Sequence, residues 1–257
     1  MSRILLISEG TNPDKKIIEQ LLKVYKNKNI EYEIETYDTN IYMLYQEIKR
    51  EYEDSIEDLQ IIPILKQKKD SFKFNKDDFS EIHLFFDYDI HHMEFLGHDN
   101  CDILNEQLKE MLNYFSDETG DRGKLYINYP MVESFFHIDL NNIDKLKNLY
   151  IDLSYVKNYK TNIELNKLKS QFVQNCDKFT KQKMNLICKQ HIMKENFITN
   201  DNYTILDYST YNNLSQIFIF ENQLTKYVSS NKISVLSIFP RFIVDYFGEE
   251  IFDTIKI

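Results

Sequence analysis

The chain has few glycines and cysteines, and this scarcity excludes several classes of site. Only five glycines occur in 257 residues. None forms a Walker-type loop, so the chain is not itself a P-loop ATPase. The three cysteines, Cys101, Cys176 and Cys188, are scattered and odd in number, which favours reduced structural thiols over a disulfide framework or a zinc cage. No Gly-x-Ser-x-Gly elbow or plausible Cys-His nucleophile pair is present either.

The sequence also lacks a long apolar run and an excess of basic residues. No stretch approaches the 18 apolar residues of a membrane helix, and no signal-peptide pattern opens the chain. We therefore expect a soluble, cytoplasmic protein without a membrane partner. The formal net charge is -10, which weighs against unaided nucleic-acid binding because proteins that grip phosphates usually carry a basic face. Such a role would need a bridging metal, a local basic patch or a basic partner.

What the chain does have is enough apolar surface for a core, in an alternating pattern over its first half. Hydrophobic residues make up 42% and aromatic residues 14%, so the chain is not disordered. Periodicity predicts strands and helices in alternation, typical of an α/β fold with a mostly parallel sheet. The predicted strands are 3–8, 30–37, 81–87 and 124–129, and the predicted helices are 12–25, 41–52 and 102–116. Pro63 interrupts an apolar run, and Lys66–Lys69 is interpreted as a solvated loop.

The alternation ends near residue 138. Beyond it, the pattern predicts helices over 140–157, 163–195, 211–230 and 235–247, the last kinked or started by Pro240. The sequence therefore predicts an α/β domain over 1–138 and a C-terminal helical domain over 139–257.

Asp87 and Asp89 are the most informative residues of the chain. They end the apolar run 82–86, and side chains two apart on a strand share one face. Both carboxylates then project from the carboxyl end of a strand, where open α/β sheets bind ligands. Glu9 ends the apolar run 4–7 in the same way. If the two strands are parallel neighbours, the three acids converge and require a cation, and oxygen ligands suit Mg²⁺ or Mn²⁺.

The order of these motifs resembles the Toprim fold, the metal-binding domain of topoisomerases, primases and OLD-type nucleases. The closer resemblance is to Toprim-like proteins of bacterial anti-phage systems, such as RloB and the effector that works with an ATPase in PARIS. Ser8–Thr11 (Ser-Glu-Gly-Thr) is similar to the first motif and Phe85–Asp89 (Phe-Phe-Asp-Tyr-Asp) to the second. Ile127–Ser134 is similar to a third segment, and Val235–Pro240 to the helical tails of these families.

This resemblance implies a metal-dependent centre that cleaves phosphodiesters, as an effector in anti-phage defence. Such centres need cations to neutralise phosphate oxygens and to activate a water. In this interpretation Asp87 and Asp89 bind Mg²⁺ or Mn²⁺. Glu9 either completes the metal shell or acts as general base, and Glu133 is a fourth carboxylate.

The resemblance also implies partners and a phosphate cradle. The backbone N–H groups of Gly10 and Thr11, at the start of the first helix, would hold a phosphate through the helix dipole. The expected partners are RNA (tRNA included) or DNA, an ATPase subunit that controls the nuclease, and a second copy of the chain. Many Toprim proteins carry further acids after the second motif, whereas here Ile90, His91 and His92 follow. A second metal site is therefore in doubt, and His91 or His92 is a candidate proton donor.

Several alternatives stay open. Asp87 and Asp89 also fit an ordinary strand end, and Glu133 fits an acidic first helical turn. The protein could be a non-catalytic binding or interaction subunit of a defence complex, or a structural subunit. A receiver domain fits poorly, because Lys124 begins its strand instead of ending it. A zinc site is disfavoured by the spacing of the four nearby histidines, which are His83, His91, His92 and His98.

One basic zone stands out in the second half. It is more typical of a solvated helix face than of a nucleic-acid path, although interleaved aromatic residues leave the second interpretation open. The zone comprises Lys157, Lys160, Lys167, Lys169, Lys178, Lys181, Lys183 and Lys189, with Tyr155, Tyr159 and Phe179 between them.

Overall fold

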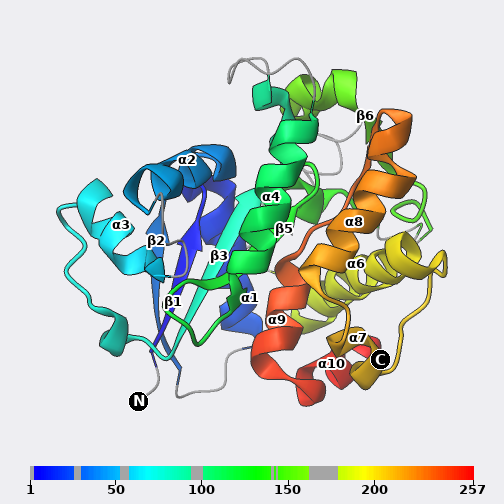
Figure 1. Cartoon of the computed structure of the whole chain (residues 1–257). Helices are drawn as coiled ribbons and strands as arrows, with labels where there is room; N and C mark the ends of the chain where they lie inside the picture. The colour runs from blue at the N-terminus through cyan, green and yellow to red at the C-terminus, as the bar shows by residue number, and fades with distance from the viewer. Residues whose placement is uncertain are drawn as a thin grey trace.

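A computed structural model describes residues 3–25, 30–52, 58–93, 101–139, 142, 144–161 and 179–257. Its main feature is a five-stranded sheet in the order β2-β1-β3-β5-β4 (Figure 1). The strands are β1 (Arg3–Ser8), β2 (Glu31–Thr36), β3 (Glu81–Asp87), β4 (Ser116–Asp117) and β5 (Gly123–Asn128). All pairs are parallel except β4 with β5. The predicted α/β class and mostly parallel sheet are confirmed.

The strands form where the sequence places short apolar runs. β1 and β3 are buried along nearly their whole length, as expected for central strands of a parallel sheet covered on both faces. β2 alternates with glutamates (Glu31, Glu33, Glu35) and lies at the sheet edge, where one side of the strand can remain hydrated. Hydrophobic pattern thus predicts the strands, and the alternation within β2 agrees with its edge position.

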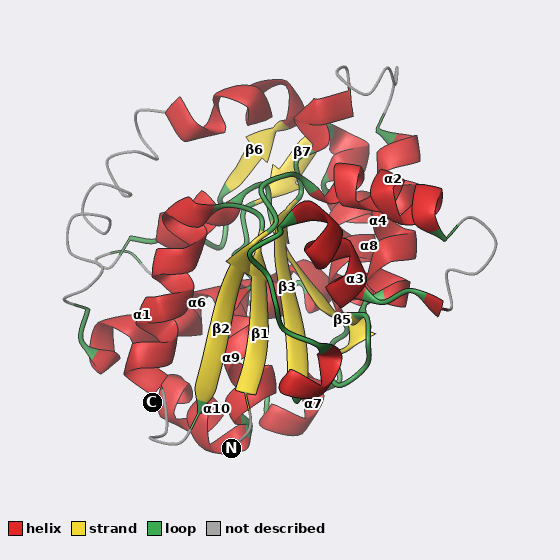
Figure 2. Ribbon diagram, turned by 90° about the vertical axis from the view of Figure 1, so that its left-hand side faces the viewer, coloured by secondary structure: helices red, strands yellow, loops and turns green. Residues whose placement is uncertain are grey.

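Helices cover both faces of the sheet because the connections run in two directions. The β1-to-β2 connection runs one way along the sheet, whereas β2-to-β3 and β3-to-β5 run the other. Right-handed crossovers then put the first helix on one face and the later ones opposite. Figure 2 shows α1 (Lys16–Tyr25) on one side, and α2 (Ile41–Glu51), α3 (Ile61–Lys68) and α4 (Asp102–Tyr114) on the other.

The C-terminal helices complete these layers. They are α6 (Lys181–Asn200), α7 (Tyr208–Asn212), α8 (Gln216–Lys226), α9 (Phe239–Phe247) and α10 (Glu249–Lys256). α9 and α6 contact α1, and α8 contacts α4. The ring of Phe242 on α9 lies 5.0 Å from that of Phe85 on β3 and 5.9 Å from that of Tyr126 on β5. One hydrophobic core therefore runs from the sheet into the helices beyond residue 139, and the expected division at 138 stays a prediction.

Two local predictions are wrong. Residues 61–68, expected to hold a broken apolar run and the start of a loop, form α3. Pro63 is the third residue of that helix, where its missing N–H costs no intrahelical hydrogen bond. Within 140–157, expected to be helical, Tyr150–Asp152 forms strand β6, followed by the 3-10 segment η6 (Leu153–Thr161). β6 pairs with β7 (Lys232–Ser234), a contact between segments distant in the sequence that local periodicity cannot report.

The predicted helix over 163–195 is described only from Phe179 onward, where α6 occupies Lys181–Asn200. The predicted 211–230 helix is divided into α7 and α8, and Pro240 lies at the start of α9 as expected. No helix in the described part of the chain is both long enough and apolar enough to cross a membrane.

Candidate carboxylate site at the sheet edge

Polar residues follow three adjacent strands at their carboxyl ends. Glu9 follows β1, Asp87 ends β3 and Asn128 ends β5. The order of connections reverses between β1 and β3, which makes this point the topological switch of the sheet. Open α/β sheets bind their ligands in the crevice at such a point. The fold thus places Glu9 and Asp87 on the two strands that flank the default ligand position.

Glu9 and Asp87 are in direct contact. Register pairs Ser8 with Phe85, and the Glu9 N–H donates to the Phe85 carbonyl oxygen over 2.9 Å. The Asp87 N–H in turn donates to Glu9 Oε2 over 3.0 Å. The expectation that these two acids, 78 residues apart, meet at one sheet edge is confirmed. One carboxylate oxygen of Glu9 is occupied by the β3 backbone, which holds the side chain across the switch point.

Asp87 is a buried carboxyl surrounded by other carboxyls. Its side chain is only 3% exposed. Burial raises its pKa well above the usual value, and the negative charges of Glu9, Asp89 and Asp14 raise it further. A hydrogen bond from the Val132 backbone N–H opposes this shift. Like charges brought this close are stabilised by a proton or by a cation.

Asp14 is a member of this group that the sequence pattern does not single out. It is buried and lies in the turn η1 (Thr11–Lys15) that leads into α1. Its position just after Pro13 indicates only a favourable first helical turn. The negative charge of Asp14 raises the pKa of Asp87, so this acid lies within electrostatic range of the carboxyl ends of the strands. A signal exists in the sequence, but an acidic first turn is common at ordinary helix starts.

Gly10 and Thr11 do not open a regular helix. Asn12 has extended dihedral angles (φ −133°, ψ 128°), and α1 itself begins at Lys16. Gly10 and Thr11 therefore precede the helical turn, and the Gly10 carbonyl oxygen accepts a hydrogen bond from the Ser8 hydroxyl over 2.9 Å. The phosphate cradle expected from a helix N-terminus at these two residues lacks that helix start in this structure.

Glu133 lies in the segment η5 (Val132–Phe136), whose first residue, Val132, bonds Asp87 through its backbone N–H. Glu133 is 3% exposed, and its charge and that of Asp87 both raise the pKa of the buried Tyr159, after burial itself. The Tyr159 hydroxyl also hydrogen-bonds to Nδ1 of His137. Glu133 and Asp87 thus share Tyr159 as a neighbour, and the role of Glu133 as a fourth carboxylate of the site stays a prediction.

Asn128 is held in place by the C-terminal segment. Its Oδ1 accepts hydrogen bonds from the Ser237 hydroxyl (3.1 Å) and from the Ile238 N–H (3.2 Å). Its Nδ2 then faces Asp87 Oδ1 over 3.4 Å. The segment after β7 is itself fixed by paired backbone bonds between Tyr129 and Leu236. Sequence reasoning missed Asn128 as a site residue, although it ends its strand in the same way as Asp87.

Asp89 is buried, 6% exposed, and electrostatically linked to Asp87. Its Oδ1 lies 3.7 Å from Nδ1 of His91, which is close enough for an ion pair when His91 is protonated. The buried Tyr42 of α2 has its pKa raised by burial and then by the charges of Asp89 and, more weakly, Glu9. His91 is therefore near the site, as a proton donor would have to be.

Of the other three histidines in this part of the chain, only His83 has a described side chain. His92 is described in its backbone only, and His98 lies outside the described residues. His83 packs against Phe242 and Tyr246 and bonds Glu81 near the start of β3. His83 is 1% exposed and is therefore part of the core.

The basic zone is only partly described. Lys157, Lys181 and Lys183 are exposed, as on a solvated face, whereas Lys167, Lys169 and Lys178 lie outside the described residues and Lys160 is described in its backbone only. Tyr159 and Phe179 are buried, at 1% and 5% exposed. These two rings cannot stack on nucleic-acid bases in this arrangement, so of the three interleaved aromatic residues only Tyr155 is available.

The carboxylate oxygens at this site are the type of ligand that hard divalent cations prefer. They do not form a complete coordination shell among the described residues. Among the described residues, no three His, Cys, Asp or Glu side chains are placed to hold a metal ion as they stand. Mg²⁺ usually binds through one or two carboxylates and keeps several waters. Asp87 with one neighbouring acid matches that requirement in ligand type, and the pKa of Asp87 is raised first by burial and then by the negative charges of Glu9, Asp89 and Asp14.

The chain was compared with protein-family models, curated proteins and solved structures, and nothing matches in any of the three comparisons. The Toprim resemblance therefore stays a prediction based on motif order and strand position.

Proposed function

We propose that the protein is a Mg²⁺- or Mn²⁺-dependent nuclease whose active centre is formed by the carboxylates of Glu9, Asp87 and Asp89. The observation that carries this proposal is the environment of Asp87. This buried acid stands at the switch point of a parallel sheet, with a pKa raised by burial and by three other acids. Perturbed carboxyls at a ligand-binding edge are typical of catalytic sites.

Each residue has a role that its position supports. Asp87 and Asp89 are metal ligands, and Asn128 orients Asp87 through its amide. Glu9 is held across the switch point by the Asp87 N–H, and its carboxylate either completes the metal shell or takes the proton of an attacking water. A bound cation would neutralise charge on phosphate oxygens and lower the pKa of that water. Asp14 and Glu133 add negative charge, and His91 is the candidate donor of a proton to the leaving oxygen.

The first experiment tests metal binding separately from catalysis. Thermal unfolding of the wild type is measured with increasing Mg²⁺ or Mn²⁺, beside Asp87→Asn and Glu9→Gln. The amide oxygen of the introduced glutamine can still accept the Asp87 N–H, so Glu9→Gln removes charge without removing that bond. Asp253→Asn, an exposed position on α10, is the matched control.

We expect Tm to rise with metal in the wild type and in the control, because a ligand that binds only the folded state stabilises it. The rise should be absent in Asp87→Asn and reduced in Glu9→Gln. An equal rise in all four proteins would place the metal elsewhere and remove the basis of the proposal.

The second experiment tests cleavage. Wild-type protein, Asp87→Asn and the Asp253→Asn control are incubated with total tRNA and with plasmid DNA, with Mn²⁺ and with a chelator. We expect metal-dependent cleavage of one substrate class by the wild type and the control only. Cleavage by Asp87→Asn at the wild-type rate would refute the proposal.

One competing function rests on the same resemblance and on the same contact between Glu9 and Asp87. In that alternative the protein is a non-catalytic, Toprim-like binding or interaction subunit of a defence complex, and the acids bind a cation for structure. Metal stabilisation without cleavage of either substrate, with and without a partner ATPase, would support it.

The wider setting is proposed on the resemblance alone. It comprises the anti-phage role, control by a partner ATPase, a cytoplasmic location and a homodimeric state. A partner would also answer the objection from charge, because a chain of net charge -10 approaches a polyanion more readily with a basic subunit beside it. Co-purification with an ATPase encoded nearby, and a mass measurement in solution, test these points.

A further inference from the structure

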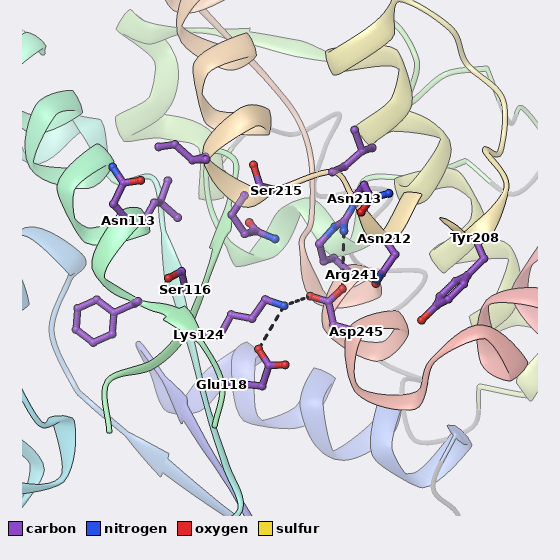
Figure 3. A pocket seen from close by; sticks show the side chains of 15 residues that line it. Asn113, Ser116, Glu118, Lys124, Tyr208, Asn212, Asn213, Ser215, Arg241 and Asp245 are labelled. Atoms are coloured by element: carbon purple, nitrogen blue, oxygen red, sulfur yellow. Dashed lines mark ion pairs between the residues drawn. The ribbon is translucent and has the colours of Figure 1, made fainter. Parts of the chain in front are cut away.

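A cavity of about 570 Å³ lies at the opposite end of β5 from the carboxylate site. Its walls come from the end of α4, from the starts of β5 and α8, and from helices α7 and α9 (Figure 3). Lys124, the second residue of β5, lines it, whereas Asn128 at the carboxylate site ends the same strand. Four residues of strand span roughly 13 Å, so the two sites are separate. The volume falls within the range of small-molecule pockets, about 300–1,000 Å³.

Gln216, the first residue of α8, is one of the residues that line this cavity, and its side-chain amide is buried and unpaired. The residue is 8% exposed, yet neither its Oε1 nor its Nε2 has a hydrogen-bond partner among the residues that the structure describes. Buried polar atoms are nearly always paired, and each exception calls for an explanation such as a ligand or an ion. Leaving both atoms of an amide without partners costs free energy that an occupant of the cavity can recover.

Gln223, two turns further along α8, provides the contrast. It is fully buried, its Nε2 donates to the Ser234 carbonyl oxygen over 2.8 Å, and its Oε1 accepts from the Ser234 N–H over 3.1 Å. The same side chain on the same helix is thus fully paired when it serves the fold. Gln216, in the wall of the cavity, leaves the same donor and acceptor unpaired among the described residues.

The charges around the cavity are paired with one another. Lys124 Nζ lies 2.8 Å from Asp245 Oδ2 and 3.5 Å from Glu118 Oε2, and Arg241 faces Asp245 at 3.7 Å, the contacts dashed in Figure 3. A charged ligand would have to break one of these pairs to be neutralised, at the desolvation cost of the charge left behind. A neutral ligand binds without that cost.

We propose that this cavity binds the hydrogen-bonding edge of a small neutral ligand, of nucleobase or carboxamide type, through the side chain of Gln216. A ligand that carries a hydrogen-bond donor next to an acceptor can form two hydrogen bonds with the glutamine amide. Glutamine recognises the edge of a nucleobase in this way. Asn113, Asn212 and Asn213 on the walls add further amides of the same kind.

The test uses purified full-length protein and isothermal titration with six separate probes. Four are the nucleosides adenosine, guanosine, cytidine and uridine, the fifth is nicotinamide, and the sixth is inorganic phosphate. The proteins are the wild type, Gln216→Met, and Gln223→Met as the stability comparison. Methionine keeps the length and helix propensity of glutamine and removes the amide.

We expect saturable binding of at least one nucleoside or of nicotinamide, weakened about tenfold or more in Gln216→Met, since two lost hydrogen bonds contribute on the order of 1 kcal/mol each. Without ligand, Gln216→Met should unfold at the wild-type temperature or above it, whereas Gln223→Met should unfold well below. Nicotinamide binding alone would assign the carboxamide source, and nucleoside binding the nucleobase source.

Three outcomes would overturn the proposal. One is the absence of binding by all five neutral probes at millimolar concentration. Another is binding of phosphate in their place, which would make the start of α8 an anion site. The third is destabilisation of unliganded Gln216→Met to the extent seen for Gln223→Met, because the amide would then be serving the fold.

Discussion

Two clusters of buried charged side chains in this protein differ in how their charge is compensated. In the C-terminal helices, the buried Arg241 bonds Glu195 Oε2 through Nε (2.8 Å) and through an Nη atom (2.6 Å), with Asp245 nearby. Burial raises the pKa of Glu195, but the charge of Arg241 pulls it down. At the sheet edge, burial and neighbouring acids both raise the pKa of Asp87, and the opposing influence is a backbone N–H.

The difference separates a structural cluster from a functional one. A buried ion pair whose partners meet each other's requirements needs nothing further from solvent or ligand. A buried group of like charges is strained until a proton or cation enters, and natural proteins retain such strain at sites that bind or react. Arg241 and Glu195 therefore serve the fold, and Asp87 serves the proposed chemistry.

The largest loss of stability is expected when the structural cluster is broken. Arg241→Leu should lower the free energy of unfolding by about 3–5 kcal/mol, because it leaves the Glu195 carboxylate buried without its cation. Urea unfolding measures the loss, with Arg50→Leu at an exposed position of α2 as the control. A loss below about 1 kcal/mol would mean that Arg241 and Glu195 are not a mutually compensated pair.

A second effect comes from Lys194, beside Glu195 on α6. Its ammonium is buried and donates to the carbonyl oxygens of Lys147 (2.6 Å) and Leu149 (3.2 Å), and burial lowers its pKa to about 7. The unfolded chain therefore binds more protons than the folded one between the folded pKa of about 7 and the ordinary value of 10.5, and stability rises with pH across that window.

Urea unfolding from pH 7 to 9 tests this. The wild type should gain up to about 1.4 kcal/mol per pH unit relative to Lys194→Met, and the exposed control Lys181→Met should keep the wild-type slope. Parallel stability curves for the wild type and Lys194→Met would show that Lys194 is charged in the folded protein throughout.

The smallest expected effect is a gain in stability for Asp87→Asn, opposite in sign to the loss expected for Arg241→Leu. Because the pKa of Asp87 is raised in the folded state, the folded protein binds the proton more tightly, and stability falls as pH rises above the ordinary value of 3.8. Asp87→Asn removes this loss, so the variant should melt above the wild type at pH 7.5 in chelator. Each kcal/mol relieved corresponds to about 2–4 °C.

Thermal unfolding across pH 5 to 8 measures the effect, with Asp253→Asn beside it. A lower Tm for Asp87→Asn in chelator would show that the Asp87 carboxylate is compensated after all, and would erase the contrast between the two clusters.

The strands and the Glu9–Asp87 contact could be predicted because they depend on local pattern and on one general rule. Apolar runs indicated the limits of β1 and β3 to the residue, and parallel neighbours must bring their carboxyl ends together. The β6–β7 pair and the bonds from Ser237 and Ile238 to Asn128 could not be predicted. Each joins segments distant in the sequence, and neither end carries a periodic signal for the other.

Local pattern alone sets which residues end the central strands, because the alternation and burial of side chains depend on neighbours a few positions away. Long-range packing brings Asp14 to the other acids, lets Ser237 orient the amide of Asn128, and leaves the amide of Gln216 unpaired in a cavity wall while that of Gln223 is paired. Those outcomes depend on where whole helices settle against the sheet, and that placement follows from the sum of many contacts across the molecule.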